Sequence, residues 1–122
     1  MQPSPLRGRS LLVVEDEPLI IIDIEFAFEL TGAELTTTSL MEHALILVEH
    51  DGLAGAIVDH AIGDEDSSKL YERLNARGIP FVIYTAHSLP QEDCKGGILV
   101  SKPALAEDLV AIVEGMLRPP QE

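Results

Sequence analysis

The chain has 122 residues, of which 46% are hydrophobic and 24% charged, and this composition predicts one soluble domain with a proper core. Its 21 acidic residues outnumber the 8 lysines and arginines, and the net charge of −13 argues against binding to nucleic acid or to an anionic membrane. Cys94 is the only cysteine, so no internal disulfide can form, and the lack of an apolar leader or membrane span leads us to expect a cytoplasmic protein.

Strand and helix patterns alternate along the chain. After a flexible lead-in at residues 1–9, strands are expected at residues 10–14, 33–37, 55–58, 81–84 and 98–101. Helices are expected between and after them, at residues 18–31, 39–50, 67–77 and 104–117. Pro18 suits a first helical turn, and Gly32 and Gly78 suit helix ends. Ser39 is expected to cap the second helix.

Strands separated by helices of this length predict an α/β fold, a single doubly wound sheet of five parallel strands with right-handed crossovers. The domain is expected to span residues 10–118, with a tail at residues 119–122 and no output domain. The 16 residues between Thr85 and Lys102 include a proline and two glycines and must also hold the last strand. The fourth helix is therefore expected to be short, two turns or less, or replaced by an irregular segment.

Polar side chains stand where four of the strands end. Glu15 and Asp16 follow the first strand, Asp59 the third, and Thr85 and Lys102 the last two. Open α/β sheets bind ligands at this edge, and three carboxylates would repel one another without a cation. We therefore expect a divalent metal, Mg²⁺ or Mn²⁺ in its place, with oxygen ligands from the three acids and from a backbone carbonyl after Asp59.

The same cluster suits phosphoryl transfer. Asp59 can act as a nucleophile and become an aspartyl phosphate, because this chemistry needs charge neutralisation and placement more than it needs an acid or base. Lys102 can pair with one phosphoryl oxygen as a point charge, and Thr85 can donate its hydroxyl to another. Each signal alone occurs widely, but the whole set in this order at strand ends is specific.

Four segments resemble a response regulator receiver domain of the CheY-like type, and the resemblance extends from about Ser10 to Leu117. The segments are residues 12–20 (LVVEDEPLI), 57–59 (IVD), 84–86 (YTA) and 101–103 (SKP). The resemblance implies a (βα)5 flavodoxin-like sheet with the strand order 2-1-3-4-5. It also implies that Asp59 is the phosphoacceptor, Thr85 the switch hydroxyl and Lys102 the lysine that binds the phosphoryl group.

The resemblance also assigns the metal ligands. Glu15 and Asp16 match the acidic pair of the family, and Ala61 matches the position whose backbone carbonyl binds the metal. The peptide bond between Lys102 and Pro103 is expected to be cis, an isomer that only bonds to proline adopt at low cost.

Within that family the chain is most similar to a subgroup typified by a Phe-Ala-Thr-Gly-Tyr stretch and a short fourth helix. The subgroup is associated with histidine kinases of the HWE type. Tyr84, Ala86 and His87 depart from this stretch, and Leu99 stands where many receivers carry an aromatic switch residue. We hypothesise that His87 alters the lifetime of the aspartyl phosphate; the alternative is a side chain that faces solvent or a partner.

The first helix is apolar around too much of its circumference for packing on a sheet alone. Packing on the sheet does not account for Ile21, Ile22 and Phe26, which we expect to be exposed. Contiguous exposed apolar groups usually mark a partner surface. In receivers the first helix meets the kinase or the phosphotransfer helix bundle. We therefore expect a docking face for a sensor histidine kinase or a histidine phosphotransfer protein, or a dimer face, on a monomer or weak dimer.

The function expected from these observations is that of a stand-alone receiver of a two-component phosphorelay. It would accept a phosphoryl group from a histidine kinase on Asp59, catalyse only its own phosphorylation and slow hydrolysis, and signal by binding another protein. One alternative is a receiver that acts as a scaffold without phosphorylation. The other is a small Mg²⁺-dependent phosphohydrolase, which the lack of a cap domain and of an evident general acid makes the weaker reading.

Overall fold

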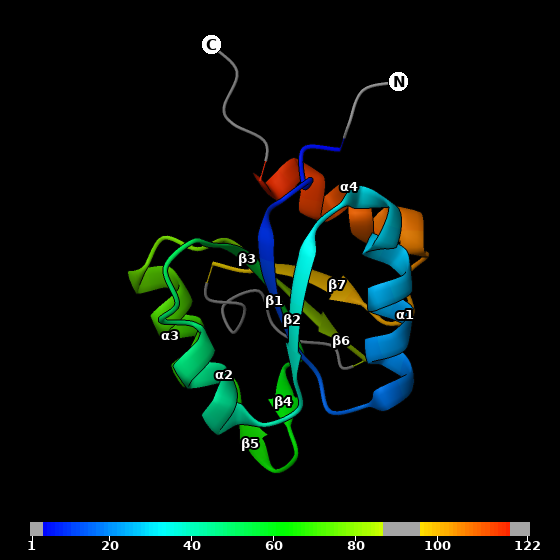
Figure 1. The fold of residues 1–122 in the computed structure, drawn as a ribbon. Coiled ribbons are helices and arrows are strands. Elements are labelled where there is room, and N and C mark those ends of the chain that lie inside the picture. The colour runs from blue at the N-terminus through cyan, green and yellow to red at the C-terminus, as the bar shows by residue number, and fades with distance from the viewer. Residues whose placement is uncertain (1–3, 87–95, 118–122) are drawn as a thin grey trace.

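Five parallel strands form one sheet in the order β2-β1-β3-β6-β7 (Figure 1). The computed structural model describes residues 4–86 and 96–117. The strands of this sheet are β1 Ser10–Val14, β2 Glu34–Thr38, β3 Leu53–Val58, β6 Phe81–Thr85 and β7 Ile98–Ser101. Counted along the chain, the order is 2-1-3-4-5, so the doubly wound, flavodoxin-like sheet is confirmed.

Helices cover both faces of the sheet (Figure 1). One face carries α1 (Pro18–Phe28) and α4 (Ala106–Leu117), and the other carries α2 (Met41–Leu47) and α3 (Ser68–Ala76). A short 3-10 turn, η1 (Glu29–Thr31), continues α1, and Gly32 ends it in the left-handed conformation at φ 77°. That conformation costs little only for glycine, so this predicted helix end is confirmed.

Side chains of the inner strands contribute to two separate hydrophobic cores, one on each face of the sheet. Leu11 and Val13 of β1 belong to the core under α1 and α4, whereas Leu12 and Val14 belong to the core under α2 and α3. All four side chains are 0% exposed. Because successive strand residues point to opposite faces, a strand covered on both sides must be apolar at every position. Burying each such side chain contributes about 1.5–3 kcal/mol to stability.

The second helix is shorter than its sequence pattern suggests. It spans Met41–Leu47, and Leu40 rather than Ser39 is its cap residue. The Leu40 backbone N–H instead donates to the Thr38 hydroxyl at 3.2 Å. The predicted Ser39 cap is therefore wrong: this helix has no side-chain cap bond, and the Thr38 hydroxyl bonds only the residue before its first turn.

The segment before β1 packs against the domain where the structure describes it. Leu6 is 0% exposed and belongs to the core under α1 and α4. The Ser4 hydroxyl donates to Glu114 Oε2 at 2.7 Å, and the Gly8 N–H donates to the Gly32 carbonyl at 2.9 Å. The packed unit therefore begins before the expected boundary at Ser10.

A small antiparallel hairpin follows β3 and was not expected from the sequence. It consists of β4 (Ala61–Ile62) and β5 (Glu65–Asp66). Gly63, at φ 61°, begins its two-residue turn, and glycine followed by aspartate is a known signal for such turns.

Two further expectations concern the chain after β6 and the membrane. Most of the interval in which a short or irregular fourth helix was expected, residues 87–95, lies outside the described residues. Within the described part of the chain, none of the helices combines the length and apolar character needed to cross a bilayer.

Candidate functional site

Two neighbouring strands bring the acidic side chains together. β1 and β3 pair in parallel with Val14 opposite Val58, so Glu15 and Asp59 each follow the last paired residue. The Asp59 N–H donates to the Val14 carbonyl at 3.0 Å, and the Glu15 N–H donates to the carbonyl of Thr38 at 3.0 Å. Sheet hydrogen bonding thus continues past both strand ends and fixes where these two residues lie.

Lys102 reaches the same point from the end of β7. Its Nζ donates to Glu15 Oε1 at 2.9 Å, to Glu15 Oε2 at 3.0 Å and to Asp59 Oδ2 at 2.9 Å. The side chains of Lys102, Glu15 and Asp59 are 12%, 2% and 13% exposed. These charges therefore interact largely out of water, where electrostatic attraction is stronger than at a solvated surface.

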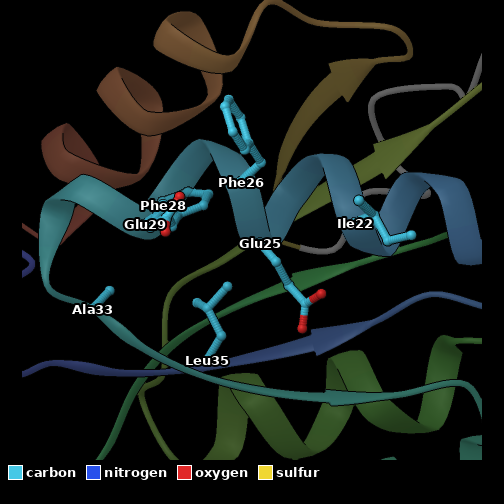
Figure 2. A pocket seen from close by; sticks show the side chains of 7 residues that line it. All are labelled: Ile22, Glu25, Phe26, Phe28, Glu29, Ala33 and Leu35. Carbon is cyan, nitrogen blue, oxygen red and sulfur yellow. The ribbon is translucent and has the colours of Figure 1, made fainter.

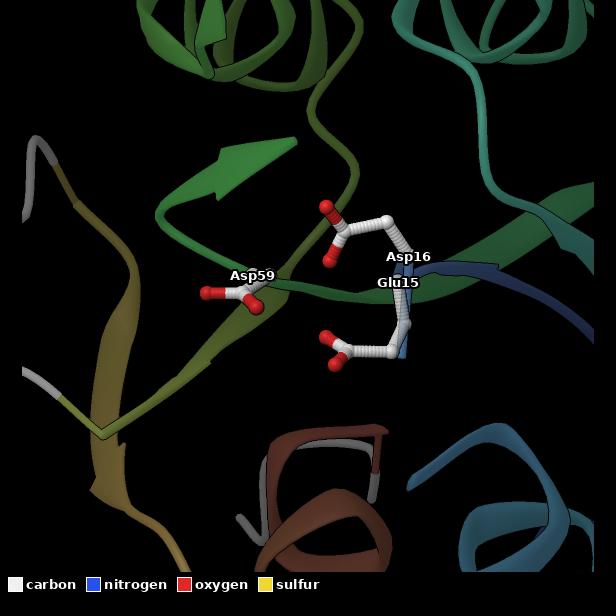
Figure 3. A group of neighbouring side chains, drawn as sticks. All are labelled: Glu15, Asp16 and Asp59. Atoms are coloured by element: carbon white, nitrogen blue, oxygen red, sulfur yellow. The ribbon is translucent and has the colours of Figure 1, made fainter. Parts of the chain in front are cut away.

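Asp16 is the third acidic residue of the group. Figure 3 shows the carboxylates of Glu15 and Asp16 pointing from the end of β1 toward Asp59. One oxygen atom of each of the three carboxylates lies within 4.8 Å of the other two. The turn of the β4–β5 hairpin holds Asp16 in place, because the Gly63 N–H donates to Asp16 Oδ2 at 2.9 Å.

This arrangement fits a hard divalent cation. Mg²⁺ binds oxygen atoms at about 2.0–2.1 Å in an octahedron, so its ligand oxygens lie no more than about 4.2 Å apart. Three carboxylate oxygens within 4.8 Å of one another need only small movements to meet that geometry. When all three acids are ionised, their three negative charges exceed the single positive charge of Lys102, and a dication would balance this excess.

The pKa values of the neighbouring acids Glu15 and Asp59 are shifted in opposite directions. Burial, and then the neighbouring Asp59, raise the pKa of Glu15 from about 4.5 to about 7. Burial also acts to raise the pKa of Asp59, but its bonds with Glu15 and Lys102 outweigh this and lower the pKa. Burial works against the charge of Lys102, yet the two carboxylates keep the pKa of Lys102 above its usual value. Asp59 is therefore the member of the pair that stays ionised.

The acids and the lysine line a cleft of about 400 Å³ at the sheet edge. Its described lining residues are Glu15, Asp16, Glu17, Ile20, Asp59, Ala86, Lys102 and Pro103. Glu17, the third acid in a row, was not singled out from the sequence, although its place next to Asp16 would have been a signal. A cleft of this size has room for a phosphoryl group and an ion, and its charged wall faces solvent.

Thr85 reaches the sheet edge but does not line the cleft. Its side chain is 0% exposed, and by the alternation of strand residues Thr85 shares a face of β6 with Phe81 and Ile83. Its backbone carbonyl accepts the Lys102 N–H at 2.9 Å, so it helps to place the lysine. The peptide bond between Lys102 and Pro103 is cis, as expected.

The backbone around Asp59 is held by hydrogen bonds that the sequence did not predict. The His60 N–H donates to Asp59 Oδ1 at 2.7 Å, which leaves Oδ2 for Lys102. The Ser67 hydroxyl donates to the Asp59 carbonyl at 2.7 Å, and Ser67 is 0% exposed. A serine before a helix predicts a cap, so its actual bond to a residue eight positions earlier could not be foreseen.

The remaining predicted positions lie around this centre. Ala61 is half-buried in β4, opposite Asp66. Tyr84 is buried on the side of α1 and α4, whereas Leu99 packs against the opposite core. His87 lies outside the described residues.

The first helix presents the exposed apolar side chains that were expected. Ile22 and Phe26 are 57% and 74% exposed, whereas Ile21 is half-buried. A groove of about 440 Å³ runs between α1 and β2 (Figure 2) and is lined by Ile22, Glu25, Phe26, Phe28, Glu29, Ala33 and Leu35. In Figure 2, Leu35 points from β2 toward Glu25 on α1, while Phe26 points away from the strand toward α4.

Comparison with solved structures shows which fold this is. A response regulator receiver domain (CheY-like) from Methanospirillum hungatei matches with a TM-score of 0.80 at 19% identity, over 90% of this chain and 94% of that chain. The receiver domain of a sensor histidine kinase from Pseudomonas aeruginosa matches with a TM-score of 0.78 at 21% identity, over 90% and 98% of the two chains. That structure has a magnesium ion coordinated in its active-site cleft.

A larger protein contains a similar domain. The response regulator PhyR from Brucella abortus matches with a TM-score of 0.75 at 27% identity, over 90% of this chain but 48% of PhyR, so this chain spans about half of its length. No protein-family model and no curated protein matches the sequence. The structural neighbours are receiver domains of response regulators, and this chain has their fold.

Proposed function

We propose that this protein is a receiver of a two-component phosphorelay, which accepts a phosphoryl group on Asp59 and signals by binding another protein. The observation that carries the proposal is the ion-paired cluster in which Lys102 Nζ lies 2.9 Å from both Asp59 Oδ2 and Glu15 Oε1. Receiver domains among the structural neighbours support the same role. The protein would be a signalling phosphoacceptor of the bacterial cytoplasm rather than a metabolic enzyme.

Asp59 is the nucleophile in this proposal. Burial acts to raise the pKa of Asp59, but its bonds with Glu15 and Lys102 outweigh this and lower the pKa, so Asp59 is ionised and has an electron pair to form the new bond. In transfer from a phosphohistidine, an Asp59 oxygen forms the new bond to phosphorus while the donor's phosphorus–nitrogen bond breaks. The electron pair of the broken bond leaves with the imidazole nitrogen. Slow hydrolysis then returns the carboxylate, as water attacks the phosphorus.

Lys102 and Thr85 stabilise the bound phosphoryl group. The ammonium has three N–H donors, all of them directed to carboxylate oxygens here, and one of them would turn to a phosphoryl oxygen. The Thr85 side chain is fully buried, so a movement would have to bring its hydroxyl to another phosphoryl oxygen in the cleft. That movement would couple phosphorylation to the neighbouring surface.

Glu15, Asp16 and Asp59 would hold the metal, together with the backbone carbonyl of Ala61. When bound, Mg²⁺, or Mn²⁺ in its place, neutralises charge on the phosphoryl oxygens and on the acids around them. The carboxylates alone would repel an incoming phosphoryl group, so we expect transfer to depend on the ion.

The proposed phosphoryl donor is a sensor histidine kinase of the HWE-like type or a histidine phosphotransfer protein. The short-fourth-helix subgroup typified by Phe-Ala-Thr-Gly-Tyr remains part of this proposal. The docking face would consist of Ile21, Ile22 and Phe26 on α1. Glu25 and Glu29 line the adjoining groove, and α1 contains no basic residue, so a helix with apolar anchors and basic flanks would complement it.

Phosphorylation by a small donor tests the proposal. The protein is incubated with acetyl phosphate and Mg²⁺ and its intact mass is measured, for the wild type, Asp59→Ala and Asp64→Ala. We expect the mass of one phosphoryl group on the wild type and on Asp64→Ala, an exposed acid of the nearby turn, and none on Asp59→Ala. An unmodified wild type, or a modified Asp59→Ala, would contradict the proposal.

Two further measurements separate the alternatives. A wild type that takes no phosphoryl group and does not bind beryllofluoride with Mg²⁺ would be a phosphorylation-independent scaffold. Repeated turnover of an aryl phosphate, lost in Asp59→Ala, would identify a phosphohydrolase.

A further inference from the structure

Tyr84 contacts both the site lysine and the loop that follows it. It is the next-to-last residue of β6 and is 6% exposed. Its hydroxyl oxygen accepts the Ala104 backbone N–H at 3.0 Å. The centre of its ring lies 5.6 Å from Lys102 Nζ, within the range of a cation–π contact. One side chain thus meets the head of the lysine and the backbone two residues beyond it.

The loop between β7 and α4 has few backbone donors to fix it. Lys102 gives its N–H to the Thr85 carbonyl, and Pro103 has none to give. The next donor is the half-buried Ala104, and it is bonded to the Tyr84 hydroxyl. Without that hydroxyl the Ala104 N–H would lose its partner, and of these two backbone hydrogen bonds only the one to Thr85 would remain.

We propose that Tyr84 is a positioning residue for Lys102: its hydroxyl fixes the loop after the lysine, and its ring faces the ammonium, so that Nζ stays directed at Asp59. Lysine has a flexible four-carbon stem, and the hydrogen bonds of its ammonium here go to the acids at its tip. When a phosphoryl group and an ion take up those acids, the contacts with Tyr84 remain. The inference rests on the proposed function and extends it to a residue that touches neither the ion nor the phosphoryl group.

The test compares Tyr84→Phe, which removes only the hydroxyl, with Tyr84→Leu, which also removes the ring. Tyr71→Phe is the matched control, because Tyr71 is 1% exposed and lies in the core on the opposite face of the sheet. Phosphorylation by acetyl phosphate is measured at saturating Mg²⁺ over a range of donor concentrations, and the Mg²⁺ dissociation constant is measured separately.

We expect Tyr84→Phe to lower kcat, here the first-order rate constant of phosphorylation at saturating donor, about five-fold, the factor that a typical hydrogen bond is worth, and Tyr84→Leu to lower it further. The Mg²⁺ dissociation constant should change less than two-fold, because Tyr84 contacts none of the three acids. Tyr71→Phe should keep the wild-type kcat. An unchanged kcat in Tyr84→Phe, or an equal loss in Tyr71→Phe, would overturn the inference.

A double-mutant cycle shows whether Tyr84 acts through the lysine. Lys102→Ala should slow phosphorylation by itself, and adding Tyr84→Phe should then cause no further loss. If the two losses multiply instead, Tyr84 acts independently of Lys102 and the inference is wrong.

A third measurement does not depend on phosphorylation. In the metal-free protein, hydrogen exchange of the Ala104 amide should be at least about five-fold faster in Tyr84→Phe than in Tyr71→Phe. If the wild type accepts no phosphoryl group, the proposed function fails, and this exchange rate alone decides the inference. Equal exchange in the two variants overturns it.

Discussion

Glu15 controls the charge of the site. Its carboxylate is 2% exposed and lies against the ammonium of Lys102, beside the carboxylate of Asp59. The sequence predicted that these residues meet at the sheet edge, since residues at parallel strand ends share that edge. It could not show that Lys102 bonds Glu15 as well as Asp59, nor that the Thr85 side chain is fully buried and does not line the cleft. Side-chain direction at a strand end depends on packing that no local pattern encodes.

Mg²⁺ binding should depend on pH through Glu15. Its pKa is raised to about 7, so between about pH 4.5 and 7 the folded, metal-free protein holds a proton that the unfolded chain has released. The free energy of unfolding without metal should therefore fall as the pH rises through this window. Mg²⁺ must displace the same proton, so its affinity should rise by up to about tenfold per pH unit and level off above pH 7.

Titration calorimetry at several pH values, without phosphoryl donor, measures this dependence. Glu15→Gln is the control, because it keeps the shape of the side chain but cannot titrate, and its weaker Mg²⁺ binding should vary much less with pH. An affinity of the wild type that stays constant from about pH 5 to 7 would rule out the expected role of Glu15.

Secondary-structure elements differ in how well local signals foretold them. The strands β1, β3, β6 and β7 followed from apolar runs, and the ends of two helices followed from the positive-φ glycines Gly32 and Gly78. The end of α2 and the β4–β5 hairpin could not be predicted from local signals. The end of α2 is set by tertiary packing, and each strand of the hairpin has only two residues. The segment before β1 was expected to be loose because it is rich in Pro, Gly and Arg, yet a single leucine in it reaches the core.

Leu6→Ala should destabilise the domain although the residue precedes the first strand. Leu6 is 0% exposed, and a cavity of this kind costs about 2–5 kcal/mol of unfolding free energy. Leu30→Ala makes the same chemical change at a side chain that is 98% exposed, so its effect should stay within about 0.5 kcal/mol. Urea unfolding of both variants measures the difference, and equal midpoints would show that the N-terminal segment does not belong to the cooperative unit.

On the scale of the whole molecule, the candidate site lies at the edge of the sheet, and the candidate docking face lies on the helical layer beside it. The edge of the sheet holds the acids and the lysine, and the exposed apolar side chains of α1 lie on the layer shared with α4. Tyr84 and Phe26 both line a pocket of about 260 Å³ between these helices. A partner on α1 would therefore bind close to the residues behind Lys102.

Phe26→Glu tests the docking face. Phe26 is 74% exposed, so the substitution should leave thermal stability and phosphorylation by acetyl phosphate unchanged. Transfer from the cognate kinase should fall at least about tenfold, as expected for an interface anchor. Ile46→Glu places the same charge on α2, at a side chain that is 70% exposed, and should transfer normally. Equal losses in both variants would mean that α1 has no special part in docking.

The all-acidic polar residues of α1 have a consequence for handling the protein. Phe26 and Leu30 form an exposed apolar surface that favours self-association. The surrounding negative charge keeps neighbouring molecules apart at neutral pH. Acidification toward the isoelectric point of about 4.5 removes that repulsion. Concentrated samples should then turn cloudy, and Phe26→Glu should delay the onset of turbidity.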